Sequence, residues 1–356
     1  MPKLLYGVSP IGLGHATRSL VLVGELRRQG AEVRLFSGGN AAEFLRERGE
    51  AADSIVDDAV PSVAGLEMGR VALWYLRSWL AQRGNVRRAE KLIASYAPDI
   101  VVCDEEFSGV TAAGTAGVRR VFVADELSLG FARGWLARKI EERVGRWYGG
   151  LLASVDMVVI PEAGEDGGNR RHVGPIVRRL TRAPAETRKE LGLPDGRLVL
   201  LSMSGSGIGR ELGERMKAAL DVDGLRDATL VVTGNRGEKL FGARVIDLGV
   251  VPDNHDLVAC ADLVVSTAGK STIDEAAASG TPIIAIPIRH HAEQERNAAA
   301  LGYRWEDLGR LSELVAEKIG RRDPPKEFSG EVKAARMILS LLDGPGEGAN
   351  APASSG

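Results

Sequence analysis

The chain has 356 residues and a formal net charge of −2, because 46 Lys and Arg are nearly balanced by 48 Asp and Glu. This balance argues against binding to nucleic acid through bulk charge, and the length is enough for two domains of ordinary size. The two cysteines, Cys103 and Cys260, lie in apolar strand-like segments, which is typical of buried thiols in a reducing compartment.

Apolar segments that are typical of buried strands alternate with amphipathic helical segments along almost the whole chain. They are, in order, residues 3–8, 31–37, 99–104, 120–125 and 157–162, then 198–204, 228–234, 243–249, 262–267 and 281–287. Such alternation predicts right-handed βαβ units and parallel sheets. Two series in one chain predict an α/β fold with two doubly wound, Rossmann-like domains.

The polar segment between the two series is rich in glycine and arginine and predicts a linker. The expected organisation is an N-terminal domain at 1–165, a linker at 166–184, a second domain at 185–328, a helix at 329–343 and a disordered tail at 344–356. The chain runs directly into a strand, and no apolar run approaches the roughly 18 residues of a membrane-spanning helix. A cytoplasmic protein is therefore expected.

The first strand is followed by the segment GLGHATRS, which predicts a loop and the start of a helix. In this segment Gly12 and Gly14 come just before His15. The third glycine of a dinucleotide fingerprint is replaced by Arg18, and the second strand ends in Ser37 instead of an acid, so a dinucleotide site is not expected. His15 stands where it can point into a ligand crevice as a catalytic group. The alternative is a helix-start residue bonded to nearby backbone.

Asp104 and Asp125 each end a predicted strand and are candidate catalytic partners of His15. At the carboxyl edge of a parallel sheet, either carboxylate could hold the imidazole in one tautomer and stabilise its protonated form. Either aspartate could instead cap the loop or helix that follows. Glu105 and Glu106 add further carboxylates at the same place.

Tryptophans and basic residues are concentrated at 71–88 and 129–152. Basic amphipathic helices with tryptophan can lie in a membrane interface, so peripheral contact with the inner face of the cell membrane is one interpretation. Packing within the domain is the other.

In the second half, the loop after residues 198–203 offers Ser204, Gly205 and Ser206 to a phosphate group. Arg178, just past the predicted linker, is a candidate cation for a diphosphate. Because the adjacent Arg179 is also basic, a solvated arginine pair is the alternative.

The segment 262–298 predicts a strand, a small-residue loop, a helix, a strand and a polar loop. Ser271 and Asp274 resemble a capping box, Gly280 ends the helix, and Glu275 is expected in its first turn, where it could bind ligand hydroxyls. The helix start is an anion site in this interpretation. The polar loop brings further donor-binding candidates to the same edge: His290, Glu293 and Gln294. Adjacent His290 and His291 lack further ligands at suitable spacing, so no metal or cofactor is expected.

Over residues 3–320 the chain resembles glycosyltransferases of the GT-B fold, in particular the group of the bacterial peptidoglycan lipid-linked N-acetylglucosaminyltransferase and its archaeal relatives. The resemblance rests on the segment AGKSTIDE, which ends at Glu275, on the proline that follows it and on RHHAEQERNA. It also rests on GLGHATRS near the start. It implies that Glu275 binds the ribose of a UDP donor and Gln294 the donor sugar. It also implies that Gly269, Lys270, Ser271 and Thr272 line the phosphate and sugar region, that Arg178 contacts the diphosphate, and that Gly12, Gly14 and His15 lie over the diphosphate and acceptor side.

The resemblance implies a metal-independent transfer of N-acetylglucosamine or another hexose from a UDP-sugar to a hydroxyl or lipid-linked acceptor, with the two domains facing a central cleft. His15 is the candidate base. The first loop has fewer glycines than that of the bacterial enzyme, and SMSGSGIG replaces a Gly-Ser-Gln-Gly pattern, so the resemblance fixes the donor class better than the acceptor. The alternatives are a UDP-sugar 2-epimerase, whose Gly–Thr–Arg–Pro–Glu-like loop is absent here, and a non-catalytic nucleotide-sugar-binding protein.

Overall fold

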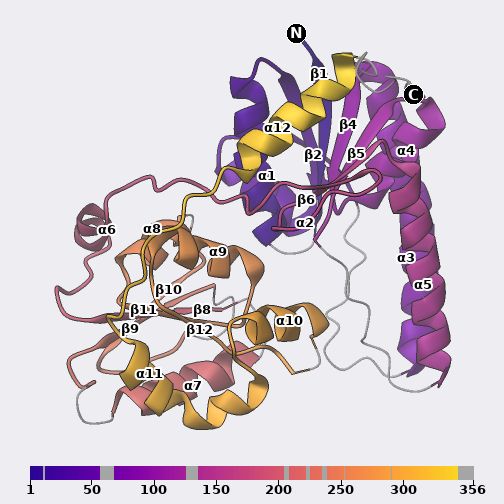
Figure 1. The fold of residues 1–356 in the computed structure, drawn as a ribbon. Helices are drawn as coiled ribbons and strands as arrows, with labels where there is room; N and C mark the ends of the chain where they lie inside the picture. Colours follow the sequence, from indigo (N-terminus) through magenta and orange to yellow (C-terminus); the bar gives the residue numbers. More distant parts are fainter. Residues whose placement is uncertain are drawn as a thin grey trace, which may run out of the picture. The chain divides into compact units, whose positions relative to one another are not determined.

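Figure 1 shows the computed structural model of the chain. The structure describes residues 1–10, 13–56, 68–125, 135–203, 208–221, 225–234, 239–251, 253–289 and 291–343. The chain forms two compact units: the first comprises Met1–Glu126, Arg146–Ile176 and Ser329–Gly356, and the second comprises Leu127–Gly145 and Val177–Phe328. Each unit is built on its own parallel sheet with helices on both faces, so the predicted α/β class with two Rossmann-like domains is confirmed.

The sheet of the first unit has seven strands in the order β3-β2-β1-β4-β5-β6-β7, and all of its pairs are parallel. The strands are β1 (Lys3–Val8), β2 (Glu32–Gly38), β3 (Ala52–Val56), β4 (Ile100–Asp104), β5 (Arg119–Val123), β6 (Met157–Ile160) and β7 (Arg170–His172). The strand order reverses direction between β1 and β4. In open parallel sheets, ligands bind outside the carboxyl ends of the strands at such a point.

Side chains alternate across this sheet and form a core on each face. Leu4 and Tyr6 pack with one group of helices, whereas Leu5 packs with the other. The helices are α1 (Leu13–Arg28), α2 (Gly39–Glu47), α3 (Met68–Tyr96), α4 (Phe107–Ala116), α5 (Trp135–Ser154) and α12 (Gly330–Ser340), which continues into η2 (Leu341–Asp343). Of α5, only the part from Arg146 onward belongs to the first unit. The α1, α2 and α12 helices contribute to the first core, and α3, α4 and the end of α5 contribute to the second.

The ends of the first unit differ from the expected organisation. The range 166–184, expected as a linker, contains β7, which pairs with β6 and extends the sheet. The helix expected at 329–343 is α12, and it lies against α1, as Figure 1 shows for the yellow and indigo ends of the chain. Its start approaches residues 174 and 175 so closely that a Cβ on Gly330 would lie 2.4 Å from the carbonyl oxygens of Gly174 and Pro175. The expected tail at 344–356 lies outside the described residues.

The second unit has a five-stranded parallel sheet in the order β10-β9-β8-β11-β12, which reverses between β8 and β11. The strands are β8 (Leu198–Ser202), β9 (Thr229–Thr233), β10 (Val245–Gly249), β11 (Leu263–Ser266) and β12 (Ile283–Ala285). The helices are α6 (Pro184–Glu190), α7 (Ile208–Leu220), α8 (Asn254–Cys260), α9 (Lys270–Ser279), α10 (Ala292–Ala300), η1 (Trp305–Arg310) and α11 (Leu311–Lys318). Within this unit α8 and α9 cover one face of the sheet and α7 and α11 the other (Figure 1).

The two cysteines are free and buried in these cores, as predicted. None of the described helices is long and apolar enough to cross a membrane. The two tryptophan-rich stretches fall largely on α3 and α5, and the end of α5 packs in the second core of the first unit through Tyr148 and Leu152.

Candidate active site

The reversal of strand order in the first sheet brings His15 and Asp104 together. His15 is the third residue of α1, and Asp104 is the last residue of β4. Because Val8 is the register partner of Asp104, the chain leaves β1 beside this aspartate, and the backbone amide of Ser9 donates to its carbonyl oxygen at 2.9 Å. Helix α1 then turns back over the strand ends with His15 facing the Asp104 carboxylate.

Asp104 is fully buried and is the centre of a polar cluster. His15 Nδ1 lies 3.0 Å from Asp104 Oδ1, and the hydroxyl of Ser19 donates to Oδ2 at 3.1 Å. Arg18 donates to the same carboxylate twice, from Nε at 2.9 Å and from Nη2 at 2.6 Å. Such a two-bonded pair between guanidinium and carboxylate fixes both groups in one orientation.

Arg18 also connects this cluster to Asp125, because its Nη1 donates to Asp125 Oδ1. Of the two predicted partners, therefore, Asp104 contacts His15 directly and Asp125 is linked to Asp104 through the arginine. The sequence analysis noted Arg18 only as a missing glycine. Its position three residues after His15 was the available signal, since residues three apart share one face of a helix.

The cluster shifts the pKa values of its members in opposite directions. Burial would raise the pKa of Asp104, but the guanidinium of Arg18 and the hydrogen bond from His15 hold it well below its usual range. Burial would lower the pKa of His15, but the hydrogen bond and the negative charge of Asp104 outweigh this and raise the pKa to about 9. The pair with Asp104 therefore favours the protonated form of the imidazole.

In the second unit, the start of α9 lies just beyond the carboxyl end of β11. Gly269 is the N-cap residue and makes no side-chain capping bond, so the first amides of the helix depend on other partners. The capping box predicted for Ser271 and Asp274 is wrong, because Asp274 forms an ion pair with Lys270 one turn earlier. Ser271 and Thr272 in the first turn are half-buried.

Glu275 lies in the second turn of α9, not in the first as predicted, because the helix already starts at Lys270. The glutamate is 3% exposed, and its Oε1 accepts a hydrogen bond from Nε of Arg178 at 2.8 Å. Both residues had been predicted to bind the donor, but a direct ion pair between them was not predicted. His255 of α8 is a further buried side chain of this region, with Nε2 3.0 Å from the hydroxyl of Ser279. Burial lowers the pKa of His255.

The polar segment after β12 is held by its own amide side chains. Gln294 is buried, and its side-chain oxygen accepts from the backbone amide of Ile288 at 3.0 Å. Asn297 donates to the carbonyl oxygen of Ala268 at 3.1 Å and so connects α10 to the loop before α9. His291 caps the start of α10, and Glu293 in its first turn is half-buried.

Several predicted site residues cannot be placed. Gly12, Ser204, Gly205, Ser206 and His290 lie outside the described residues. Gly14 is the second residue of α1 and is exposed, next to His15. Ser37, which stands where a dinucleotide site would have an acid, donates through its hydroxyl to the carbonyl oxygen of Val8 at 2.8 Å. It is therefore committed to the end of β1.

Among the described residues, one group has atoms close enough to hold a metal ion. One potential ligand atom each from His15, Glu105 and Asp125 lies within 4.8 Å of the others. Arg18 donates to Asp125, so this carboxylate already faces a cation. The predicted absence of a metal stays a prediction.

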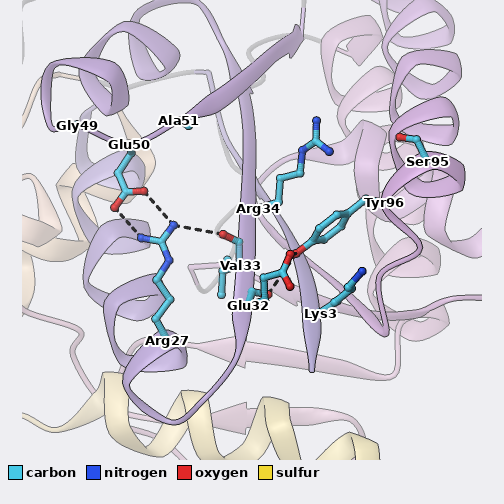
Figure 2. Close-up of a pocket in the computed structure, with 10 residues that line it drawn as sticks. All are labelled: Lys3, Arg27, Glu32, Val33, Arg34, Gly49, Glu50, Ala51, Ser95 and Tyr96. Atoms are coloured by element: carbon cyan, nitrogen blue, oxygen red, sulfur yellow. Dashed lines mark hydrogen bonds and ion pairs between the residues drawn. The ribbon is translucent and has the colours of Figure 1, made fainter. Parts of the chain in front are cut away.

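A groove of about 670 Å³ lies away from these residues, beside the amino ends of β1 and β2 (Figure 2). Its lining includes Lys3, Arg27, Arg34, Glu50 and Tyr96. Both arginines in it have carboxylate partners: Arg27 binds both oxygens of Glu50, and Arg34 binds Asp53. No sequence motif points to this groove.

Two family models match the chain, one in each half. Residues 2–123 match glycosyl transferase family 1, and residues 236–312 match the glycosyltransferase family 28 C-terminal domain. An uncharacterized glycosyltransferase of Methanosarcina acetivorans is 24% identical over 371 residues, with 96% of each chain covered. The chain is a glycosyltransferase of the GT-B fold.

Other similarities fit this family. A second relative comes from Nocardia farcinica and is named UDP-N-acetylglucosamine--N-acetylmuramyl-(pentapeptide) pyrophosphoryl-undecaprenol N-acetylglucosamine transferase. It is 27% identical to the present chain, and the aligned region covers 93% of the present chain and 85% of the Nocardia protein. The crystal structure of the glycosyltransferase SnogD from Streptomyces nogalater has the same fold, with a TM-score of 0.57, 21% identity and coverage of 96% and 99%. The matched ranges include His15 and Asp104 in one half of this glycosyltransferase and Glu275 and Gln294 in the other.

Proposed function

We propose that this glycosyltransferase transfers N-acetylglucosamine or another hexose from a UDP-sugar to a hydroxyl of its acceptor, with His15 as the general base. The observation that carries the proposal is the pair of His15 and Asp104 at the strand-order reversal of the first sheet, with Nδ1 3.0 Å from Oδ1. A buried carboxylate on one ring nitrogen leaves the other nitrogen available for proton transfer.

In the proposed reaction His15 acts in its neutral form: the acceptor hydroxyl donates its proton to the free Nε2 as its oxygen attacks the anomeric carbon. The bond between that carbon and the diphosphate oxygen breaks, and UDP leaves with the electron pair. Asp104 keeps the Nδ1–H tautomer before the transfer and stabilises the imidazolium after it.

The second unit supplies the proposed donor site. The start of α9 offers amides and a partial positive charge to the diphosphate, and the proposal assigns the leaving charge to this helix start and to Arg178, without a metal. Glu275 would accept from the ribose hydroxyls, which requires that its ion pair with Arg178 opens or is shared when the donor binds. The name of the Nocardia relative supports a UDP-N-acetylglucosamine donor.

A lipid-linked acceptor at the membrane is part of the proposal. On α5, Arg143, Arg146 and Trp147 are exposed at helical spacing, and Trp147 is 53% exposed. An exposed aromatic ring beside cationic side chains suits the interface of an anionic membrane. Flotation with anionic liposomes is expected to carry the protein upward, and Trp147→Ala with Arg143→Ala should reduce this. Protein that stays at the bottom with anionic lipid would exclude the membrane contact.

Product analysis tests the reaction. Incubation with UDP-sugars, with and without a membrane lipid extract, should give a glycosylated product and UDP only when an acceptor is present.

His15→Ala should reduce turnover by about 10²–10⁴-fold, the usual cost of losing a general base, while UDP affinity is kept. His172→Ala is the control, because it removes an imidazole from β7 of the same unit and should keep the wild-type rate. Near-full activity of His15→Ala would refute the base, and conversion of the UDP-sugar without an acceptor would favour an epimerase.

The donor site has its own test. Glu275→Ala is expected to weaken UDP binding in calorimetry, since the ribose hydroxyls lose their acceptor and Arg178 loses its ion pair with this carboxylate. Asp256→Asn is the matched control, because Asp256 is another buried carboxylate of this unit that pairs with an arginine, Arg182. Equal loss of affinity in both variants would mean that the effect is structural and not local to the ribose.

A further inference from the structure

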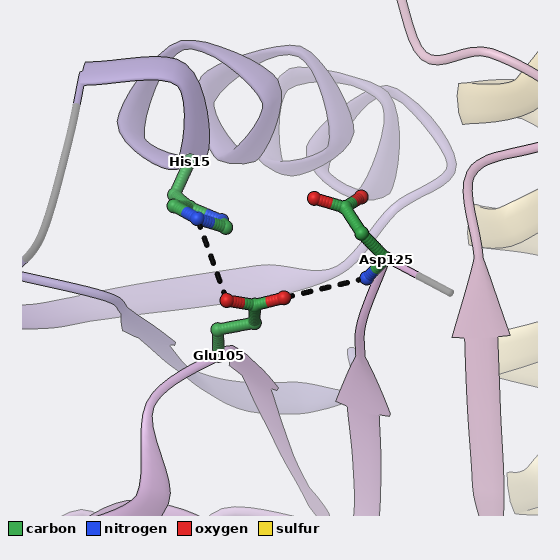
Figure 3. Close-up of side chains that lie close together, drawn as sticks. All are labelled: His15, Glu105 and Asp125. Atoms are coloured by element: carbon green, nitrogen blue, oxygen red, sulfur yellow. Dashed lines mark hydrogen bonds and ion pairs between the residues drawn. The ribbon is translucent and has the colours of Figure 1, made fainter. Parts of the chain in front are cut away.

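Glu105 is a third carboxylate beside the pair of His15 and Asp104, and the mechanism above does not use it. It follows Asp104 directly, and its side chain turns toward His15 (Figure 3). Glu105 Oε2 lies 3.5 Å from Nε2 of His15, and Oε1 accepts from the backbone amide of Asp125 at 3.4 Å. The imidazole therefore has a carboxylate at each ring nitrogen: Asp104 at Nδ1 and Glu105 at Nε2.

The backbone of Glu105 has a φ of 45°, in the left-handed region that side chains other than glycine rarely adopt. This conformation is maintained although it is unfavourable for glutamate, and its amide donates to the carbonyl oxygen of Val123 at 3.1 Å. Glycine would adopt the same backbone without strain, so folding alone does not require a carboxylate here.

The two carboxylates differ in how firmly they are held. Asp104 is fully buried and receives bonds from His15, Arg18 and Ser19, whereas the Glu105 side chain is 29% exposed. Burial and the charges of Asp125 and Asp104 raise the pKa of Glu105, although His15 and Arg18 act against this. Glu105 is thus the partner of His15 that can be displaced at lower cost.

A general base must come within about 2.6–3.2 Å of the hydroxyl that it deprotonates. In the structure Glu105 lies on that side of Nε2, with Oε2 3.5 Å away. We propose that Glu105 is a positioning residue that holds the protonated His15 ring between turnovers, and that the acceptor hydroxyl takes its place at Nε2 once water has removed the Nε2 proton. After transfer, the proton on Nε2 again faces Glu105 until water removes it. The catalytic part of this proposal rests on the proposed function, but the pairing in the resting protein does not.

The consequence concerns the pH at which the base becomes available. The charged groups that face His15 in the described structure are Asp104 from β4, Glu105 after it, and Arg18 from α1, which in turn pairs with Asp125 after β5. The negative charge of Glu105 favours the imidazolium, so its removal should make His15 lose its proton at lower pH.

The experiment measures the pKa of His15 directly, by NMR of protein with ¹³C-labelled histidine. His15→Gln assigns the resonance among the five histidines. In Glu105→Gln we expect the pKa of His15 to fall by about one unit, the lower end of the effect of an opposite charge at this distance. The matched control is Glu50→Gln, which removes a carboxylate of similar exposure, 23% against 29%, from the groove in Figure 2. It should leave the His15 pKa unchanged.

Kinetics separate this proposal from the proposed function. In Glu105→Gln, the acidic limb of the kcat/KM profile should move to lower pH by the same amount as the pKa. An unchanged His15 pKa in this variant would overturn the role of Glu105. A lowered pKa in a protein that transfers no sugar from any UDP-sugar would uphold the pairing and overturn the proposed function.

Glu105→Gly gives a second test: its stability should equal or exceed that of the wild type, while the His15 pKa falls as in the glutamine variant. A pKa that does not fall in the folded glycine variant would also overturn the proposal.

Discussion

Asp104 has four hydrogen bonds from three side chains, His15, Arg18 and Ser19, and no exposed surface. A buried carboxylate of this kind is stable only while its partners remain, because an unpaired charge in the interior costs several kcal/mol. Arg18 therefore has a structural role as well as an electrostatic one. Its single positive charge pairs with both Asp104 and Asp125.

Loss of Arg18 should accordingly cost more than an ordinary surface change. For Arg18→Met we expect a loss of about 3–5 kcal/mol in the free energy of unfolding, measured in urea, because Asp104 keeps its charge without its main partner. Arg34→Met is the control, since Arg34 forms a two-bonded pair with Asp53 at the exposed edge of the same sheet. The control should cost about 1 kcal/mol or less. Equal costs would show that the Asp104 cluster has no special dependence on Arg18.

His15 makes stability depend on pH in a defined window. Its pKa is 6.5 when exposed and about 9 in the folded chain, so the folded state binds the extra proton between these values. This contribution, about 3 kcal/mol at most, is fully present below pH 6.5 and is lost as the pH rises through 9. Urea unfolding at pH 6 and pH 10 should show the loss in the wild type and a smaller one in His15→Gln. An identical loss in both would assign it to other groups.

The sequence allowed His15 and a strand-end aspartate to be predicted as neighbours, since both follow parallel strands. It could not show which aspartate makes the contact, because that depends on β4 and not β5 lying next to β1. Nor could it show the pair of Arg178 and Glu275, whose residues are 97 positions apart. Arg178 was predicted to contact a diphosphate, which stays a prediction, and its ion pair with Glu275 was not predicted.

At the scale of elements, α9 shows where local patterns succeed and fail. Its end at Gly280 was predicted, and Gly280 adopts a φ of 65°. Its start was predicted wrongly. Ser271 and Asp274 have the spacing of a capping box, but in the structure Asp274 forms an ion pair with Lys270. The resulting shift by two residues moves Glu275 from the first turn to the second.

Gly280 is also close to a neighbouring segment, which gives a prediction for this element. A Cβ at Gly280 would lie 2.1 Å from the carbonyl oxygen of Asp323, so Gly280→Ala adds a clash to the strain of its φ. Gly302 follows α10 with a φ of 80° and nothing within 4 Å of its Cβ position, so Gly302→Ala carries the strain alone. We expect about 1 kcal/mol for Gly302→Ala and about 3 kcal/mol or more for Gly280→Ala in urea unfolding. Similar costs would mean that the segment at Asp323 moves aside freely.

At the scale of the whole molecule, the alternation of strands and helices was sufficient to predict two parallel-sheet units. The pattern did not predict that α12 belongs with the first unit, because an amphipathic helix shows its apolar face but not the partner of that face. The short strands β3 and β7 were also missed. Both lie at the edges of the first sheet, and β7 is a three-residue polar stretch with no apolar run to signal it.

Removal of α12 tests its place in the first unit. Its residues Ala334, Ala335 and Ile338 have no exposed surface and pack in the core that contains Leu22 and Leu26 of α1. Loss of the Ile338 side chain alone costs about 3 kcal/mol in such a site, so a chain that ends at 328 should show a much lower melting temperature for the first unit. A chain that ends at 343 is the control, because it keeps every described residue. An unchanged melting temperature for the shorter chain would show that α12 is dispensable.

The return of α12 also has a consequence for biosynthesis. A ribosome delivers residues in order, so the strands of the first sheet are made before the sheet of the second unit, but the helix that covers α1 is made only after that second sheet. Until then, the groove that receives Ala335 and Ile338 stays open to water and to other nascent chains. The first unit therefore stays incompletely covered while the second unit is translated, and chaperones that bind apolar surfaces would meet its open face during that time.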